Sequence, residues 1–397
     1  MPYRLSLRWV VILVYMLASA LAYLDRMVLA ALAPDLLKEF RLSGTDYGFL
    51  LSAFSIFYAA EAPLAGLFLD RVGLRRGMAI SVSLWSLASA SRGLVGGFRE
   101  LLGAMAALGI AESAVIPGSG KASAVYLRPE ERAFGAAVNQ IGLSLGGMAA
   151  PVLAGVVSVA YGWRATFLVT GILGFLWLPL WLLAVRKAPA VEMSSRASSV
   201  RISSMLQDRT FWGLIAANTL VMTGYSLWTN WTPLYLVQAH GLTPAEANLR
   251  YVWIPPIFAG AGGLIGAFLA FRLMRSGMEV HAARMRICRA SGLLLLLAVL
   301  IPVAPGPGLA TAMICLSSFG LLCFSVNLYS MPLDFYGAGR AGFGVAALTF
   351  AYGLMQTVYS PVVGRMVDSQ GYALVWVTAA ILPLAGYVVL RGTQPRR

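Results

Sequence analysis

Three ionisable residues interrupt strongly apolar stretches of the sequence: the consecutive pair Asp25 and Arg26, and Glu112. A charged side chain near the centre of a bilayer costs at least about 2.5 to 3.5 kcal/mol, so it normally faces a partner or a polar cavity. An arginine can hold a carboxylate through two parallel hydrogen bonds, which a lysine cannot reproduce. Intramembrane carboxyl groups often relay protons. These residue types predict Arg26 as an anion-binding residue, with Asp25 and Glu112 as proton-coupling residues.

Each of the three residues also has a structural alternative. Arg26 could form a permanent pair with Asp25 or Glu112, or extend towards the outer surface, and each acid could be a protonated or hydrogen-bonded packing residue. Adjacent residues of a helix point about 100° apart, so Asp25 and Arg26 cannot both face the same point. We expect one of the two to face a cavity and the other to face a neighbouring helix.

Polar and aromatic residues in the same apolar stretches are further candidates for substrate binding. In the first half of the chain they are Tyr23, Tyr58, Gln140 and Ser144. In the second half they are Trp228, Asn230, Tyr352 and Gln356. Aromatic residues of membrane helices often pack or mark the membrane interface, so packing is the alternative for each of them.

The composition requires membrane helices to position these residues. Of the 397 residues, 59% are hydrophobic and only 12% are charged, and the mean hydropathy is +0.76. Apolar runs of about 20 residues recur, each long enough to cross the roughly 30 Å hydrocarbon layer as a helix. We place twelve helices at about 9–33, 46–69, 78–97, 100–123, 134–159, 165–185, 210–236, 247–271, 288–304, 308–332, 341–366 and 372–390.

The net charge of +14 follows this topology and does not indicate a nucleic-acid partner. Most Lys and Arg residues fall in loops on one side of the predicted helices. The other side has Lys38, Arg41, Arg99, Arg164 and Arg250, with Arg365 near it. By the positive-inside rule, the basic side is cytoplasmic and carries both termini. We therefore expect a multi-pass protein of a bacterial inner membrane.

The stretch 186–209 is polar, basic and rich in serine, and it divides the chain almost in half. It is typical of a cytoplasmic linker, which leaves bundles of six helices at 1–185 and 210–397. An internal repeat supports the division, because the sequence at 150–155 in helix 5 recurs at 360–365 in helix 11.

The loop after helix 2, GLFLDRVGLRR at 66–76, resembles the cytoplasmic signature of the major facilitator superfamily. The resemblance extends over essentially the full chain. It implies an all-α polytopic membrane protein with twelve transmembrane helices in two pseudo-symmetric six-helix bundles. It also implies a cytoplasmic gate at Gly66, Asp70, Arg71, Gly73, Arg75 and Arg76. Two departures are Phe271, where the second-half copy would carry an acid, and Met105, where the family usually has an arginine in helix 4.

Within that superfamily, four segments resemble the anion:cation symporters that carry galactonate and hexuronates. They are YLDR at 23–26 with LAP at 32–34, GIAES at 109–113 with Pro117 and Lys121, PEERA at 129–133, and WTPLYL at 231–236 with Gly241 and Leu242. The resemblance implies that substrate binds the arginine, that a proton binds an acid, and that Tyr58 contacts substrate. We regard Lys121 and Arg92 as gate or interface charges.

We therefore expect proton-coupled uptake of a small organic anion, such as a sugar acid, by alternating access of the two bundles. The alternative is a proton-driven exporter of amphipathic compounds, for which the loss of the helix 4 arginine at Met105 leaves room. A receptor is disfavoured because the sequence has no added output domain. An enzyme is disfavoured because no nucleophile, nucleotide or metal-ligand pattern is present. We expect no metal or cofactor, packing roles for the three cysteines, and a monomer that contacts lipid.

Overall fold

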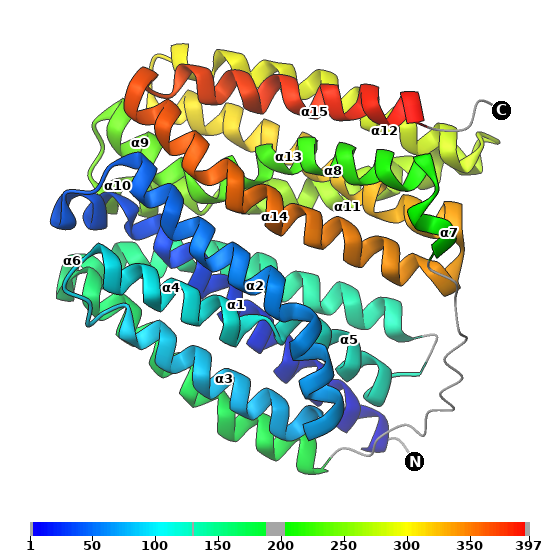
Figure 1. Cartoon of the computed structure of the whole chain (residues 1–397), viewed down its shortest axis with the longest axis horizontal. Helices are drawn as coiled ribbons and strands as arrows, with labels where there is room; N and C mark the ends of the chain where they lie inside the picture. Colours follow the sequence, from blue (N-terminus) through cyan, green and yellow to red (C-terminus); the bar gives the residue numbers. More distant parts are fainter. Residues whose placement is uncertain (1–2, 129–130, 188–202, 394–397) are drawn as a thin grey trace. The chain divides into compact units, whose positions relative to one another are not determined.

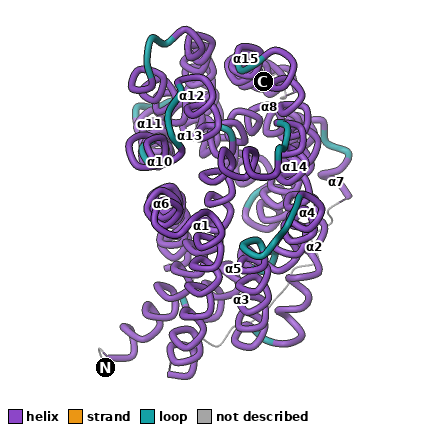
Figure 2. The backbone as a smooth tube through the Cα atoms, turned by 90° about the vertical axis from the view of Figure 1, so that its left-hand side faces the viewer, coloured by secondary structure: helices purple, strands orange, loops and turns teal. Residues whose placement is uncertain are grey.

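The computed structural model of the protein describes residues 3–128, 131–187 and 203–393, and it is helical throughout these ranges, with short connections (Figures 1 and 2). No strand occurs in the described ranges. Most of the predicted linker, at 188–202, lies outside them. Contacts divide the chain into two compact units, Met1–Arg196 with Thr243–Trp253, and Ala197–Leu242 with Ile254–Arg397.

The first unit contains the helices of the first half of the chain. They are α1 (Tyr3–Phe40), α2 (Gly44–Val72), α3 (Leu74–Ser91), α4 (Phe98–Glu112), α5 (Val115–Tyr126) and α6 (Arg132–Lys187). The long α6 is two helices, because Gly162 breaks it with a φ of 80° that is rare for residues with a side chain. Two short elements, α10 (Pro244–Ala247) and the π-helical η2 (Asn248–Val252), also belong to this unit.

The second unit contains the remaining helices. They are α7 (Ser203–Leu206), α8 (Arg209–Asn230), α9 (Thr232–His240), α11 (Pro255–Arg275), α12 (Val280–Leu295), the 3₁₀ helix η3 (Leu296–Val303), α13 (Pro307–Tyr336), α14 (Ala338–Gln370) and α15 (Ala373–Thr393). Figure 1 shows long helices lying side by side within each unit.

Twelve membrane crossings follow from these elements. Within the described residues, nine helical segments are long and apolar enough to span a bilayer, and one of them is the double helix α6. The helix α3 and the pair α8 and α9 supply the other two crossings. The predicted all-helical, twelve-helix fold is confirmed.

Several predicted helix boundaries are wrong. The first helix begins at Tyr3 instead of about residue 9, and the third ends at Ser91 instead of about residue 97. Helices 4 and 7 are each broken in two, at Ser113 and Ala114 and at Trp231. Three and two residues after these breaks stand Pro117 and Pro233, which have no N–H to donate to the carbonyl four residues earlier.

The first helix packs closely against the first part of α6. A Cβ atom on Gly142 would lie 2.5 Å from the Met16 carbonyl oxygen, so only glycine permits this approach. The second part of α6 contributes the stacked pair Trp177 and Trp181, whose ring centroids are 5.3 Å apart. The Trp177 indole N–H donates to the Val14 carbonyl of α1 at 2.7 Å. The orientation of α1 is therefore fixed by two parts of the same chain segment.

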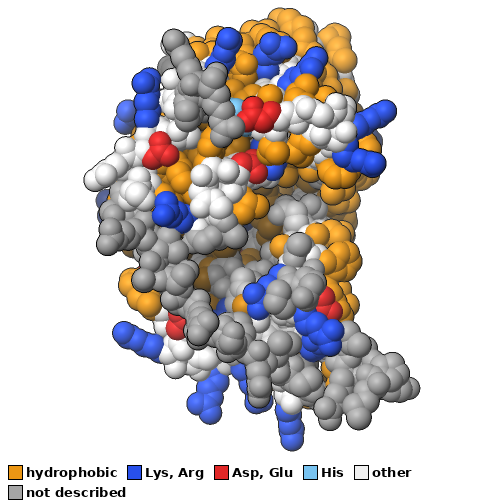
Figure 3. All heavy atoms as spheres, turned by 90° about the vertical axis from the view of Figure 1, so that its right-hand side faces the viewer, with side chains coloured by type: hydrophobic (Ala, Val, Ile, Leu, Met, Phe, Trp, Pro, Cys, Tyr) orange, Lys and Arg blue, Asp and Glu red, His pale blue; other side chains and the backbone are white. Residues whose placement is uncertain are grey.

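Charged side chains concentrate at the helix ends. Figure 3 faces one end of the helices and shows Lys and Arg side chains around it. At the opposite end of the first unit, Arg164 forms an exposed ion pair with Glu39 at 2.9 Å. This is the side on which the sequence predicts few basic residues.

Candidate anion site

Arg26 and Glu112 form an ion pair that links α1 to α4. Arg26 Nε donates to Glu112 Oε2 at 2.8 Å. The Glu112 side chain is fully buried, whereas the Arg26 side chain is 23% exposed. The pair uses only Nε, so the two terminal nitrogens of the guanidinium are not committed to Glu112. The pairing considered as an alternative for Arg26 is present, and the arginine keeps an accessible edge.

Two aromatic rings of α2 lie beside the Arg26 guanidinium. Its Cζ lies 4.3 Å from the centroid of the Tyr58 ring and 4.8 Å from that of Phe54. The two rings stack on each other with a centroid distance of 5.5 Å. A cation over aromatic faces is attracted electrostatically and loses rotational freedom. The arrangement prepares a planar group for a planar anion such as a carboxylate.

Glu112 has one buried oxygen without a hydrogen-bond partner. Its Oε2 accepts from Arg26, whereas Oε1 is buried and unpartnered among the described residues. Leaving a buried acceptor unsatisfied costs about 1–3 kcal/mol, and such atoms often mark functional sites. A proton on Oε1 would convert Glu112 into a neutral acid when Arg26 engages another anion.

The chain brings Glu112 to this point through a glycine and a helix break. Gly109 lies against α2, where a Cβ atom would come within 2.5 Å of the Phe54 carbonyl oxygen. The helix α4 then ends at Glu112. Beyond the break, the Tyr15 hydroxyl donates to the Val115 carbonyl at 2.7 Å. The close contact of Gly109 with α2 and the end of α4 at Glu112 together place the Glu112 carboxyl group beside Arg26.

Asp25 points away from this site and into the interior of the unit. It is 1% exposed. Its Oδ1 accepts from Arg92 Nη2 at 2.8 Å and from the Ser89 hydroxyl at 2.5 Å. We expected either Asp25 or Arg26 to face a neighbouring helix, and Asp25 faces Arg92 and Ser89 in this way. A proton-coupling role for Asp25 stays a prediction.

The other first-half candidates lie on α1 and α6. Tyr23 is half-buried one helical turn before Arg26. Gln140 is exposed, and the Ser144 hydroxyl donates to the Gln140 carbonyl at 3.2 Å. The neighbouring Asn139, which the sequence did not single out, accepts from the Ser19 hydroxyl of α1 at 2.5 Å.

The second-half candidates lie in the second unit. Trp228 is 6% exposed and stacks on Trp376, with ring centroids 4.8 Å apart. Asn230 donates to the Ser226 carbonyl of its own helix at 2.9 Å. These two residues therefore make packing and helix-end contacts.

The other two candidates lie one helical turn apart on α14. Tyr352 is half-buried and meets Tyr225 edge to face, with centroids 6.0 Å apart. Gln356 is 9% exposed one turn later. The predicted substrate roles of all four second-half residues stay predictions.

The predicted gate residues surround the turn between α2 and α3. Gly73 joins the two helices with a φ of 86°, a conformation that favours glycine. Asp70 accepts from Lys121 of α5 at 2.8 Å, and the same Nζ donates to the Leu69 carbonyl at 2.6 Å. The partner of Asp70 is thus a lysine of the fourth crossing. Gly66, Arg71, Arg75 and Arg76 lie on the two helix ends that meet at this turn.

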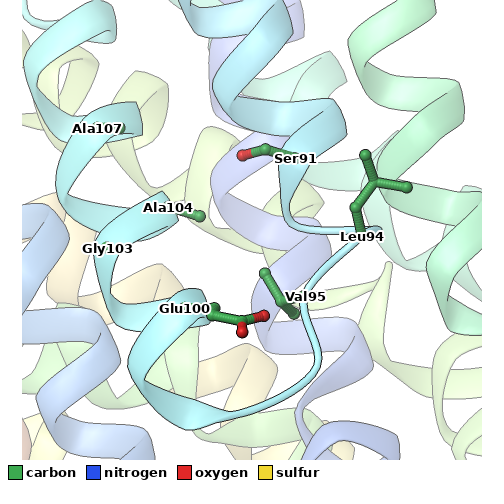
Figure 4. A pocket seen from close by; sticks show the side chains of 7 residues that line it. All are labelled: Ser91, Leu94, Val95, Glu100, Gly103, Ala104 and Ala107. Atoms are coloured by element: carbon green, nitrogen blue, oxygen red, sulfur yellow. The ribbon is translucent and has the colours of Figure 1, made fainter.

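A surface pocket in the first unit lies apart from these residues (Figure 4). It is lined by Ser91, Leu94, Val95, Glu100, Gly103, Ala104 and Ala107. Its only charged residue, Glu100, accepts from the Gly96 backbone N–H at 2.6 Å. The carboxylate therefore stabilises the turn before α4, and none of the predicted site residues lines this pocket.

The sequence did not identify Phe54 or the role of Gly109. Phe54 precedes Tyr58 by four residues, so helical spacing places both rings on one face of α2. Gly109 was part of the family motif, but its contact with α2 depends on how the helices cross. The spacing of Phe54 and Tyr58 could have been read from the sequence, whereas the contact of Gly109 with α2 required the structure.

Comparison with known proteins supplies the family. Residues 15–360 match the Major Facilitator Superfamily, and the chain belongs to this superfamily. It is similar to a hexuronate transporter of Escherichia coli K12, with 27% identity over 97% of this chain and 93% of that protein. It is also similar to a galacturonate transporter of Dickeya chrysanthemi, with 29% identity over 66% of this chain and 81% of that protein. A D-galactonate transporter of E. coli O6:H1 shares 24% identity over 98% of this chain and 96% of its own length.

A solved structure shows the same fold. A bacterial homologue of the human lysosomal transporter Spinster has a TM-score of 0.76 and 20% identity, over 99% of this chain and 96% of that one. The family resemblance drawn from the sequence is confirmed by these findings. The protein is a multi-pass membrane transporter and not an enzyme.

Proposed function

We propose that this transporter takes up a small organic anion, a sugar acid or a related carboxylate, together with protons by alternating access. The observation that carries the proposal is Arg26. Its Cζ lies 4.3 Å from the centroid of the Tyr58 ring, its side chain is 23% exposed, and only Nε donates to Glu112. An incoming carboxylate can therefore bind the two terminal nitrogens in parallel.

The named relatives support the class of substrate. Hexuronates, galacturonate and D-galactonate are the cargoes in the names of three similar transporters. Each of these compounds is a sugar acid with one carboxylate and several hydroxyl groups. A guanidinium for the carboxylate, with hydroxyl and amide side chains for the sugar hydroxyls, suits that chemistry, and Tyr23, Gln140 and Ser144 are the first-unit residues proposed for the second task.

Glu112 is the proposed proton-coupling residue. When the substrate carboxylate binds Arg26, it competes with Glu112 for the same cation. A protonated Glu112 removes that competition and avoids two anions beside one arginine. Proton binding and anion binding then favour each other, which is the thermodynamic requirement for symport.

The proposed mechanism also requires a defined orientation in the membrane and a movement of the two bundles. The basic loops put both termini in the cytoplasm of a bacterium, and the protein works as a monomer in the inner membrane. The six-helix bundles at 1–185 and 210–397, joined by the linker at 186–209, move relative to each other. The pair of Asp70 and Lys121, with the basic turn around it, serves as a gate on the cytoplasmic side.

Transport by purified protein in liposomes tests the proposal. An inward proton gradient should drive accumulation of a radiolabelled hexuronate, and Arg26→Ala should abolish it. Arg26→Lys, which keeps the charge but loses the planar fork, should recover only a small part of the activity. Arg164→Ala, in the exposed pair with Glu39, is the matched control and should transport normally.

Normal hexuronate uptake by Arg26→Ala would contradict the anion site. If the protein is instead an exporter, its expression should make cells that lack their own pumps resistant to amphipathic compounds. Resistance without organic-acid uptake would replace the proposed function with export.

A further inference from the structure

We propose that Arg92 is a positioning residue for the anion site: its buried ion pair with Asp25 fixes the rotation of α1 about its own axis, so that Arg26 faces Glu112 and Tyr58. This inference deepens the proposed function and rests on it where it concerns anion affinity. Arg92 itself pairs with Asp25 and Ser89, whereas the ion pair of the site joins Arg26 and Glu112.

Arg92 donates two hydrogen bonds to Asp25, one to its side chain and one to its backbone. Its Nη2 donates to Asp25 Oδ1 at 2.8 Å, and its Nη1 donates to the Asp25 backbone carbonyl at 3.1 Å. The guanidinium also lies over the Phe167 ring of α6, with its Cζ 4.5 Å from the centroid. Contacts to both the side chain and the main chain of one residue restrict how α1 can turn at that residue.

The hydrogen-bond network around the Asp25 carboxylate connects three helices. The Ser89 hydroxyl donates to Asp25 Oδ1 at 2.5 Å and lies 2.7 Å from the hydroxyl of Thr170. Arg92 Nη2 also donates to the Ser89 hydroxyl at 2.9 Å. The carboxylate of α1 is thus connected to α3 through Ser89 and Arg92, and to α6 through Thr170.

Three consecutive residues of α1 face three different neighbours. A Cβ atom on Gly146 of α6 would lie 3.1 Å from the Leu24 backbone nitrogen, so this side of α1 lies against α6. Asp25 faces Arg92 of α3, and Arg26 faces Glu112 of α4. Successive residues are separated by about 100° of rotation. A turn of that size would bring Asp25, an anion, to the place where Arg26 now lies.

The energetics explain why removing one partner should matter. A buried ion pair contributes little net stability compared with an apolar pair, but the loss of one partner leaves an uncompensated buried charge. With Arg92 neutralised, Asp25 would be a buried charge without a counter-ion, and α1 would lose the ion pair that holds its present rotation at this residue. A turn of α1 that brings Asp25 out of the interior would also withdraw Arg26 from Glu112 and from the incoming anion.

Thiol labelling measures the rotation without requiring substrate. The three native cysteines, Cys288, Cys315 and Cys323, are all buried, so a cysteine introduced in the first half should react above a low background. Tyr23→Cys reports the face of α1 that carries Arg26 and leaves both ion pairs intact. We expect Arg92→Gln to slow the reaction of this cysteine with a water-soluble maleimide at least fivefold, and Arg164→Gln to leave the rate unchanged.

Transport kinetics provide the second measurement. Arg92→Gln and Asp25→Asn should each raise the KM for hexuronate exchange at least tenfold, with a smaller change in kcat. The double variant Asp25→Asn with Arg92→Gln, which carries no buried charge, should recover most of the affinity and the wild-type labelling rate. Arg92→Lys should lie between the wild type and Arg92→Gln, because a lysine keeps the charge but has one donor nitrogen where the guanidinium uses two.

An unchanged labelling rate in Arg92→Gln would overturn the proposal. So would a double variant as impaired as the single variants. If Arg92→Gln does not fold, Arg92→Lys and the double variant supply the same comparison. The failure of the proposed function appears elsewhere, as normal uptake by Arg26→Ala, and the labelling result does not depend on it.

Discussion

Asp25 and Arg26 are consecutive residues of α1, yet they belong to separate ion pairs, with Arg92 of α3 and with Glu112 of α4. The first pair is fully enclosed, and in the second the arginine stays 23% exposed. One short segment therefore carries a structural charge and an accessible charge side by side. This difference in burial is the observation on which the different roles proposed for the two residues rest.

Replacement of Glu112 should separate exchange from coupling. We expect Glu112→Gln to exchange labelled for unlabelled substrate at a rate close to that of the wild type, because the amide resembles the protonated acid. Accumulation driven by a proton gradient should be lost, and the rise of wild-type uptake with falling external pH should disappear. Counterflow and gradient-driven uptake in the same liposomes provide both measurements. Gradient-driven accumulation by Glu112→Gln would assign coupling to another residue.

The Tyr58 ring should contribute to anion affinity through Arg26. Replacement by leucine removes a cation–π contact worth about 0.5–2 kcal/mol, so the KM for the anion should rise by about 2- to 30-fold. Tyr58→Phe keeps the aromatic face under the guanidinium and should raise KM much less. If Tyr58→Phe is as impaired as Tyr58→Leu, the hydroxyl and not the ring is the important group.

The close contact at Gly109 should be required for stability. A methyl group there would lie 2.5 Å from the Phe54 carbonyl oxygen and 3.1 Å from the Tyr58 nitrogen. We expect Gly109→Ala to lower the free energy of unfolding by about 1–3 kcal/mol through overpacking, as a fall in the Tm of the detergent-solubilised protein. Gly103→Ala, on the same helix, is the control, since nothing lies within 4 Å of its Cβ position. Equal Tm values for the two variants would show that α2 and α4 can move apart at little cost.

The pair of Asp70 and Lys121 should affect turnover more than stability. Their side chains are 70% and 26% exposed, and exposed pairs contribute only about 0–1 kcal/mol. We expect Lys121→Gln to leave the Tm nearly unchanged and to lower the maximal rate of uptake with little effect on KM. The exchanged pair Asp70→Lys with Lys121→Asp should recover part of the rate. A normal maximal rate in Lys121→Gln would remove this pair from the gate.

The sequence predicted the number of crossings well because length and hydropathy determine whether a segment spans the bilayer. It predicted their ends less well. The third helix stops at Ser91, just before a segment that contains Gly93, Gly96 and Gly97, although the sequence predicted helix to about residue 97. This segment is otherwise apolar at Leu94 and Val95, so hydropathy gives no boundary there. The break predicted between 159 and 165, by contrast, falls at Gly162 as expected.

The sequence predicted the individual charged residues of the candidate site but not which of them form ion pairs with each other. Asp25, Arg26 and Glu112 stand out because charge is costly in lipid. Their partners are 67 and 86 residues away in the sequence, and a partner at that distance depends on which face of each helix turns inward. Arg92 illustrates the limit, because a charge near a predicted helix end is normally read as an interfacial residue.

The broken fourth crossing has a mechanical consequence. A continuous helix resists bending, because its axis can change direction only if internal hydrogen bonds are strained or lost. Between α4 and α5 the helix is interrupted at Ser113 and Ala114, and Pro117 has no N–H to donate to the Ser113 carbonyl. The two helices therefore meet at a break, and Glu112 is the last residue of the first helix. A change of charge on that carboxyl group acts beside the break, where a small shift in position becomes a large displacement at the distant end of the helix.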